Sequence, residues 1–151
     1  MAENDEILMR SALAEARSAA EAGEVPIGAV AVVGGVIVAR GQNRVLRDCD
    51  PTAHAEVVAL RAAAQAMGNY RLLECELYVT LEPCAMCAGA MIHARLGRLI
   101  YGADDPKAGA AGSVLEVLNH PQLNHQMTVT GGVLANPCGD LLREFFRERR
   151  G

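Results

Sequence analysis

The sequence predicts an α/β fold, in which a mixed sheet of about five strands carries helices on both faces. Three observations indicate this class. Apolar residues recur at helical spacing from Asp5 to Ala22, β-branched runs follow at 29–33 and 36–39, and a strand, a helix and a strand succeed one another between residues 76 and 101. With 151 residues, 51% of them hydrophobic, the chain has the size of one globular domain, which we expect to span residues 1–151.

The N-terminal elements begin with the helix Asp5–Ala22, which has an acidic outer face and ends at Gly23, a residue suited to the left-handed conformation after a helix. The runs Ala29–Val33 and Val36–Ala39 are separated by Gly34-Gly35, a pair typical of a two-residue hairpin turn. We therefore expect two antiparallel strands after the first helix.

The middle of the chain predicts a parallel unit. A polar loop leads into an Ala- and Leu-rich helix, Ala55–Met67, that meets Gly68. A strand, a helix opened by Pro83 and a further strand then follow: Glu76–Leu81, Cys84–Ala94 and Leu99–Tyr101. This order is that of a βαβ unit.

The C-terminal third starts with the glycine-rich loop Gly102–Gly112, whose length favours a functional role. A short helix is expected at Ser113–Leu118 and a strand at Gln126–Thr130. The helix Cys138–Arg149 closes the chain, with Phe145 and Phe146 available to dock on the sheet.

Charge is distributed unevenly. The net charge is −4, and the first 24 residues alone carry six acidic side chains against two arginines, so the remainder is neutral. Arginines cluster at two places within that remainder: Arg40, Arg44 and Arg47, and Arg143, Arg147, Arg149 and Arg150. The chain therefore lacks the overall basic excess of a general nucleic-acid binder. A polyanion would have to bind at local patches such as these arginine clusters.

Cysteine usage and hydropathy predict an intracellular protein. Five cysteines are an odd number, and the N-terminus lacks the basic and apolar segments of a secretory signal. No apolar stretch is long enough to span a bilayer. We expect a cytoplasmic protein without membrane contact.

Two short motifs carry candidate chemistry: His54-Ala55-Glu56 and Pro83-Cys84-Ala85-Met86-Cys87, each at the start of an expected helix. His54, Cys84 and Cys87 supply three of the four ligands of tetrahedral zinc, which leaves one position for water. Glu56 is placed to move protons beside such a site. Alternatively, Cys49, Cys75 or Cys138 is a fourth ligand, the zinc is structural, and Glu56 is only an acid at a helix N-terminus.

The two motifs are the HxE and PCxxC signature of the zinc-dependent cytidine/deoxycytidylate deaminase superfamily. The strings GQNR, DPTAHAE, NYRL, YVTLEPCAMCAGAMIHAR and DPKAGAAGS extend the likeness over nearly the whole chain, which resembles the bacterial tRNA-specific adenosine deaminases. This resemblance implies a three-layer α/β/α sandwich with a mixed five-stranded sheet, zinc on His54, Cys84 and Cys87, and proton transfer by Glu56. It also implies a homodimer that converts adenosine to inosine at the wobble position of a tRNA anticodon stem-loop.

Four residues are candidates for contact with RNA. An asparagine such as Asn43 can read a purine edge, although it is also common in turns, and the resemblance implies contact with the flipped base. Asp105 and Lys107, in the glycine-rich loop, match the nucleotide-contacting pattern of the family. Arg149 can meet a phosphate or stack on an unpaired base.

Two rival functions stay open at this point. A deaminase of free guanine, cytosine or nucleosides would use the same zinc chemistry without an arginine patch. A non-catalytic, zinc-stabilised RNA-binding module would keep the ligands and make no use of Glu56.

Overall fold

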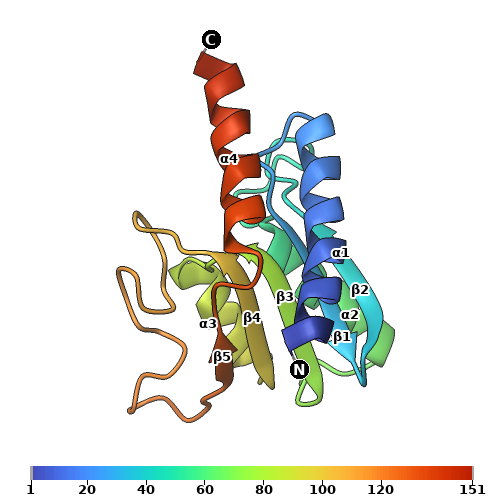
Figure 1. The fold of residues 1–151 in the computed structure, drawn as a ribbon. Helices are drawn as coiled ribbons and strands as arrows, with labels where there is room; N and C mark the ends of the chain where they lie inside the picture. Colours follow the sequence, from blue (N-terminus) through green and yellow to red (C-terminus); the bar gives the residue numbers. More distant parts are fainter. Residues whose placement is uncertain (1, 151) are drawn as a thin grey trace.

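A mixed sheet of five strands forms the middle layer of the protein (Figure 1). The computed structural model describes residues 2–150. The strands lie in the order β2-β1-β3-β4-β5; β1 is antiparallel to both its neighbours, and β4 is parallel to β3 and β5. Their bounds are β1 Gly28–Val33, β2 Val36–Gln42, β3 Cys75–Leu81, β4 Arg98–Ala103 and β5 Thr128–Thr130. The predicted hairpin and the predicted parallel βαβ unit are both confirmed.

Helices cover both faces of this sheet, which confirms the expected three-layer sandwich. They are α1 Ala2–Glu21, α2 Ala55–Met67, α3 Ala85–His93 and α4 Ala135–Arg150. In Figure 1, α1 and α4 lie in front of the sheet and α2 and α3 behind it. Within residues 2–150, no helix combines the length and apolar character that crossing a membrane requires.

The alternation of side chains along β1 fills both cores. Val30 and Val32 pack with Met9 of α1, whereas Ala29 and Ala31 belong to the core on the α2 side. All four strand residues are fully buried. Because both faces are covered, the strand is apolar throughout, as its sequence indicates.

A close approach sets the start of α2 against the sheet. A Cβ atom added at Gly41 of β2 would lie 2.4 Å from the carbonyl oxygen of Ala55 and 2.6 Å from the amide nitrogen of Ala59. Only glycine allows the first turn of α2 to come this near to the strand. The residues that open α2 are thereby held at a defined distance from β2.

The helix predicted at residues 113–118 is wrong. This segment forms turns with one isolated antiparallel bridge between Ala111 and Glu116. The amides of Val114 and Leu115 both donate to the Gly109 carbonyl, and the Ser113 amide donates to Glu82, so these groups cannot build a helical ladder. Long-range hydrogen bonds outcompete the local helical preference here.

Several other element boundaries differ from the expectations, two of them toward the C-terminal end of the chain. The last strand begins at Thr128 instead of Gln126, because the Met127 amide donates to the side chain of Asn119 rather than to β4. The last helix begins earlier than expected, at Ala135. Both differences depend on contacts or turns that local patterning does not specify.

A buried ion pair fastens α1 to the sheet. Arg98 of β4 donates to Asp5 at 2.8 and 3.2 Å and to Glu76 at 3.2 Å, and the hydroxyl of Tyr78 donates to Asp5 at 2.7 Å. Asp5 is therefore buried, not part of a solvated acidic face. Burial raises the pKa of Asp5, but hydrogen bonds from Arg98 and Tyr78 outweigh this effect and hold the pKa below its ordinary 3.8.

We predict that Arg98→Met lowers the free energy of unfolding by about 3 kcal/mol at neutral pH, because it leaves the Asp5 carboxylate buried without its counter-charge. Arg10→Met, which removes the exposed pair with Glu6, is the control and loses less than about 1 kcal/mol. Since the folded pKa of Asp5 is lowered, the benefit of Arg98 is complete above about pH 4 and is lost as the pH falls further. Urea unfolding at several pH values measures both effects; equal losses for the two variants would contradict the prediction.

Candidate functional site

The candidate metal ligands occupy the first positions of two helices on the same face of the sheet. His54 is the N-cap residue of α2, and Cys84 is the N-cap residue of α3, with Cys87 in the first turn of α3. Both N-cap residues have extended backbone, and neither side chain caps its own helix. The side chains are therefore free to turn toward one another.

The structure brings the three predicted ligands together. The Nδ1 atom of His54 lies 3.7 Å from Sγ of Cys84 and 3.5 Å from Sγ of Cys87, and all ligand atoms lie within 4.8 Å of one another. Tetrahedral zinc with ordinary bond lengths separates its nitrogen and sulfur ligands by about 3.6 Å. The spacing of the donor atoms fits a zinc ion.

The two cysteine side chains influence each other's ionisation. The side chain of Cys87, with the amides of Cys87 and Met86 and the nearby His54, lowers the pKa of Cys84 to about 5, against the opposing effect of burial. The contact with Cys84, together with burial and the Glu56 and Cys84 charges, raises the pKa of Cys87. A divalent cation between them would favour the thiolate form of both.

Glu56 lies beside this cluster without belonging to it. Its side chain, in the first turn of α2, is only 4% exposed and forms a hydrogen bond with Cys87. Burial, reinforced by the Cys84 charge, raises the pKa of Glu56 to about 7. A buried carboxyl with such a pKa can both accept and return a proton near neutral pH.

The structure does not support a closed site with four protein ligands. Among residues 2–150, no other histidine, cysteine or acidic side chain joins the ligand cluster. Cys49 is exposed, Cys75 lies at the start of β3 with its thiol toward the Glu76 carbonyl, and Cys138 belongs to the core under α1. The geometry favours three protein ligands and one open position.

Asn43 directly follows the end of β2, and the loop behind it is tied to the residue before His54. The amide of Arg44 donates to the carbonyl of Ala53 at 2.9 Å, so Asn43 and His54 adjoin a hydrogen-bonded pair. The Asn43 side chain, nearly buried, accepts from the Val45 amide. The side chain thus takes the turn role, and its place in the substrate site stays a prediction.

A buried glutamate that the sequence did not single out holds this loop. Glu24 accepts from the amides of Leu46 and Arg47 at 3.1 and 2.8 Å and from Nε of Arg47 at 3.1 Å. In the sequence Glu24 counts only as one acid among several near the first helix. Its only local signal is an isolated acid between Gly23 and an apolar strand.

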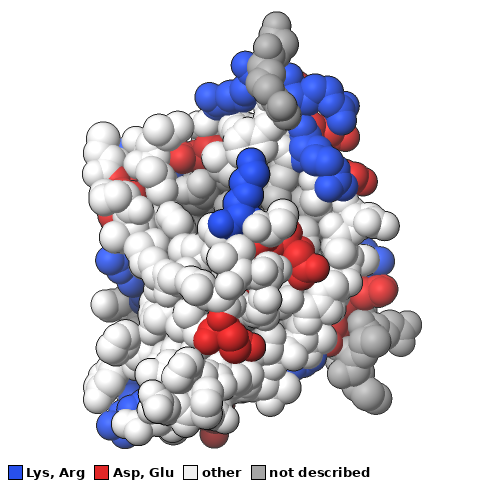
Figure 2. Space-filling model, turned by 90° about the vertical axis from the view of Figure 1, so that its left-hand side faces the viewer, with Lys and Arg blue, Asp and Glu red and all other residues white. Residues whose placement is uncertain are grey.

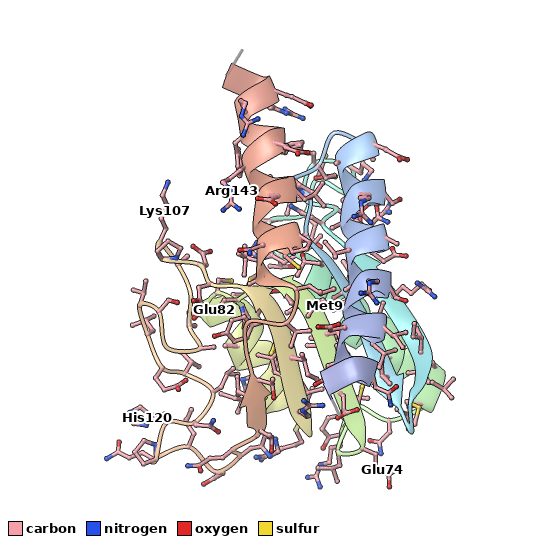
Figure 3. All side chains as sticks on the ribbon, viewed as in Figure 1. Met9, Glu74, Glu82, Lys107, His120 and Arg143 are labelled. Carbon is pink, nitrogen blue, oxygen red and sulfur yellow. The ribbon has the colours of Figure 1, made fainter. Side chains whose placement is uncertain are left out.

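Asp105 and Lys107 lie in the loop after β4, where they line a groove with Arg143 of α4. One oxygen of Asp105 accepts from the amides of Lys107 and Ala108 at 3.0 and 3.2 Å, which fixes the turn. The Lys107 side chain extends away from the loop (Figure 3), and no ion pair with it is found in the described part of the chain. Its ammonium group is available to an anion.

The arginine clusters are less free than the sequence suggests. Arg149 donates to the Gly23 carbonyl at 2.7 Å and lies over the Phe145 ring at 4.7 Å. The other paired arginines face acids of the same chain: Arg40 with Glu15, Arg44 with Asp48, Arg47 with Glu24, and Arg143 with Asp140. The side chain of Arg150 lies outside the described residues. Figure 2 shows positive side chains gathered at the α4 end of one face, above a largely uncharged surface.

Comparisons with known proteins place the chain among deaminases. A family model of MafB19-like deaminases matches residues 3–150. The tRNA-specific adenosine deaminase of Bacillus subtilis is 47% identical over 97% of this chain and 91% of its own, and that of Haemophilus influenzae is 50% identical over 98% and 86%.

Solved structures show the same fold. One, from a study of A-to-I editing by tRNA:A34 deaminases at the wobble position, has a TM-score of 0.86 and 47% identity, covering 89% of this chain and 98% of its own. The guanine deaminase of Nitrosomonas europaea is more distant, with a TM-score of 0.82 and 28% identity over 93% of this chain and 83% of its own. The fold is therefore cytidine deaminase-like.

We predict that the purified chain binds one zinc ion and that Cys87→Ser lowers zinc affinity by at least about tenfold, because one thiolate ligand is lost. Cys49→Ser is the matched control and retains the metal, since Cys49 is exposed and lies outside the cluster. Metal analysis after dialysis against a graded chelator measures both. Zinc loss in Cys49→Ser would instead support a closed site in which Cys49 is the fourth ligand.

Proposed function

The chain belongs to the MafB19-like deaminase family and to the tRNA-specific adenosine deaminases, and from this premise we propose that it converts adenosine to inosine at the wobble position of a tRNA anticodon. The observation that carries the proposal is the buried Glu56 carboxyl beside the converged His54, Cys84 and Cys87. This arrangement suits hydrolysis of an exocyclic amino group on an electron-poor ring. A tRNA substrate also accords with the predicted cytoplasmic location.

In this proposal His54, Cys84 and Cys87 hold zinc. When bound, zinc supplies a Lewis acid that makes water acidic enough to react near neutral pH. The residues present fit that ion by donor type and by spacing. The backbone amides at the start of α3 stabilise the Cys84 sulfur in its ionised form.

Glu56 is the proton carrier of the reaction. Water adds to C6 of adenine, and the carboxyl of Glu56 takes a proton from that water and delivers it to the ring nitrogen N1. A second proton then passes through Glu56 to the amino group, which leaves as ammonia. Adenosine and water are consumed, and inosine and ammonia are formed.

Four further side chains are assigned to the substrate. Asn43 reads the edge of the flipped base, and Lys107 binds a phosphate. The Asp105 carboxylate oxygen that takes no part in the turn accepts from a ribose hydroxyl. Arg149, held over Phe145, offers its remaining N–H groups to the RNA backbone.

We extend the proposal to a homodimer. A groove between α2 and α3 is lined by the apolar side chains of Val57, Leu60 and Ala90. Tyr70 stands beside this groove with 69% of its surface exposed. An exposed aromatic residue next to an apolar groove is typical of a protein–protein contact.

We predict that Glu56→Gln lowers kcat by about 10² to 10⁴ while zinc stays at one ion per chain, because the amide cannot carry the proton. The assay measures inosine in an anticodon stem-loop, with zinc content determined on the same sample. Glu74→Gln is the control, since Glu74 is exposed at the opposite end of the molecule (Figure 3).

The same assay separates the rival functions. A non-catalytic RNA-binding module would show no turnover and no effect of Glu56→Gln. A deaminase of free bases would release ammonia from guanine or cytosine in preference to the stem-loop. Either result would contradict the proposal.

We predict that Lys107→Ala weakens stem-loop binding and reduces the slope of log K against log salt by about 0.7, the value for one phosphate contact on single-stranded nucleic acid. Arg10→Ala is the control, because Arg10 lies on the acidic first helix and pairs with Glu6. Fluorescence anisotropy at several salt concentrations measures both slopes. An unchanged slope would remove Lys107 from the RNA-binding surface.

A further inference from the structure

Glu82 is a buried acid whose hydrogen bonds all go to one loop. It follows β3 and directly precedes Pro83 and the ligand Cys84, and it is 2% exposed. Its carboxylate accepts from the amides of Asp105 at 2.9 Å, Ala111 at 2.9 Å and Ser113 at 3.1 Å, and from the hydroxyl of Ser113. Four donors from residues 105–113 thus converge on one side chain.

The charge of Glu82 is balanced by these donors instead of by a cation. No ion pair with Glu82 is found among residues 2–150. A buried carboxylate without a counter-ion is costly unless hydrogen bonds satisfy it fully. The loop therefore has to keep its conformation for Glu82 to stay satisfied.

The loop is wrapped tightly around this carboxylate. A Cβ atom added at Gly109 would lie 2.4 Å from the carboxyl carbon and one oxygen of Glu82. The amide of Ala110 donates to the carbonyl of Pro83 at 2.8 Å, which ties the loop to the residue before Cys84. The loop is thereby held against the start of α3.

Glu82 also influences the position of Lys107, the candidate for phosphate contact, because it acts through Asp105. Glu82 fixes the Asp105 amide, and the Asp105 side chain in turn accepts from the amides of Lys107 and Ala108. The backbone that carries Lys107 is therefore set by a chain of two carboxylates. Ordering it before substrate arrives lowers the entropy lost on binding.

We propose that Glu82 is a positioning residue that holds loop 103–113 in the form that presents Asp105 and Lys107 to the RNA. This inference rests on the proposed function. Glu82 touches neither the substrate nor the metal ligands' donor atoms in this role, so its loss weakens substrate binding and spares the proton transfer by Glu56.

Glu82→Gln tests the inference because it keeps the shape of the side chain and replaces one acceptor by a donor that faces amide donors. We expect KM for the anticodon stem-loop to rise about tenfold, with kcat and the zinc content unchanged. In the Glu82→Gln protein without RNA, we expect hydrogen exchange at the amides of Asp105, Ala111 and Ser113 to be faster than in the wild type. Ser113→Ala, which removes only the hydroxyl donor, shifts KM in the same direction by less.

Glu116→Gln is the control, since this exposed acid neighbours the same loop. Unchanged KM or unchanged amide exchange in Glu82→Gln overturns the inference. A joint fall of kcat and zinc content also overturns it, because that pattern marks a general structural role. If Glu82→Gln does not fold, Ser113→Ala tests the inference in its place: a raised KM supports it, and an unchanged KM overturns it.

A wild-type chain that forms no inosine contradicts the proposed function, a result distinct from any of these. The exchange comparison between wild type and Glu82→Gln still reports in that case whether Glu82 orders the loop. Failure of the two proposals is thus distinguishable.

Discussion

The convergence of three ligand atoms at the starts of two helices is the constraint on which the rest of the structure depends. His54 and the two cysteines come from α2 and α3, which are about thirty residues apart in the chain yet must place their donor atoms within 4.8 Å. The parallel β3-α3-β4 unit brings α3 to this edge of the sheet, and the close approach at Gly41 sets the first turn of α2 against β2. The three-layer sandwich thus sets the distances between the three candidate ligand atoms.

The loops beside the metal site are organised by buried carboxylates. Glu24 holds the loop after β2, and Glu82 holds the loop after β4, each by accepting several backbone amides. Loops without regular secondary structure need partners for their amide groups, and a carboxylate can satisfy several at once. This solution orders the proposed substrate loops mainly through backbone amides.

The distribution of charge bears on how an acidic protein would bind RNA, as proposed above. Asp5 and Glu24 are buried against Arg98 and Arg47, so part of the N-terminal acidity is neutralised inside the fold. Several arginines outside the first helix are likewise occupied by acids of the same chain, which weakens any general attraction for polyanions. Recognition would then depend on loop shape, base contacts and a few phosphate contacts, of which Lys107 is proposed to make one.

The sequence by itself determined the order of the main elements and singled out the three candidate ligands and Glu56, because periodicity, glycine turns and the HxE and PCxxC spacings are local properties. It determined the family through strings that extend along the chain. Only the tertiary structure decided the roles of Glu24 and Glu82, the loss of the helix at residues 113–118 and the pairing of the arginines. Each of these depends on partners distant in sequence, such as Glu82 and Ser113, and a buried hydrogen bond to such a partner outweighs the weak local preference of a short segment.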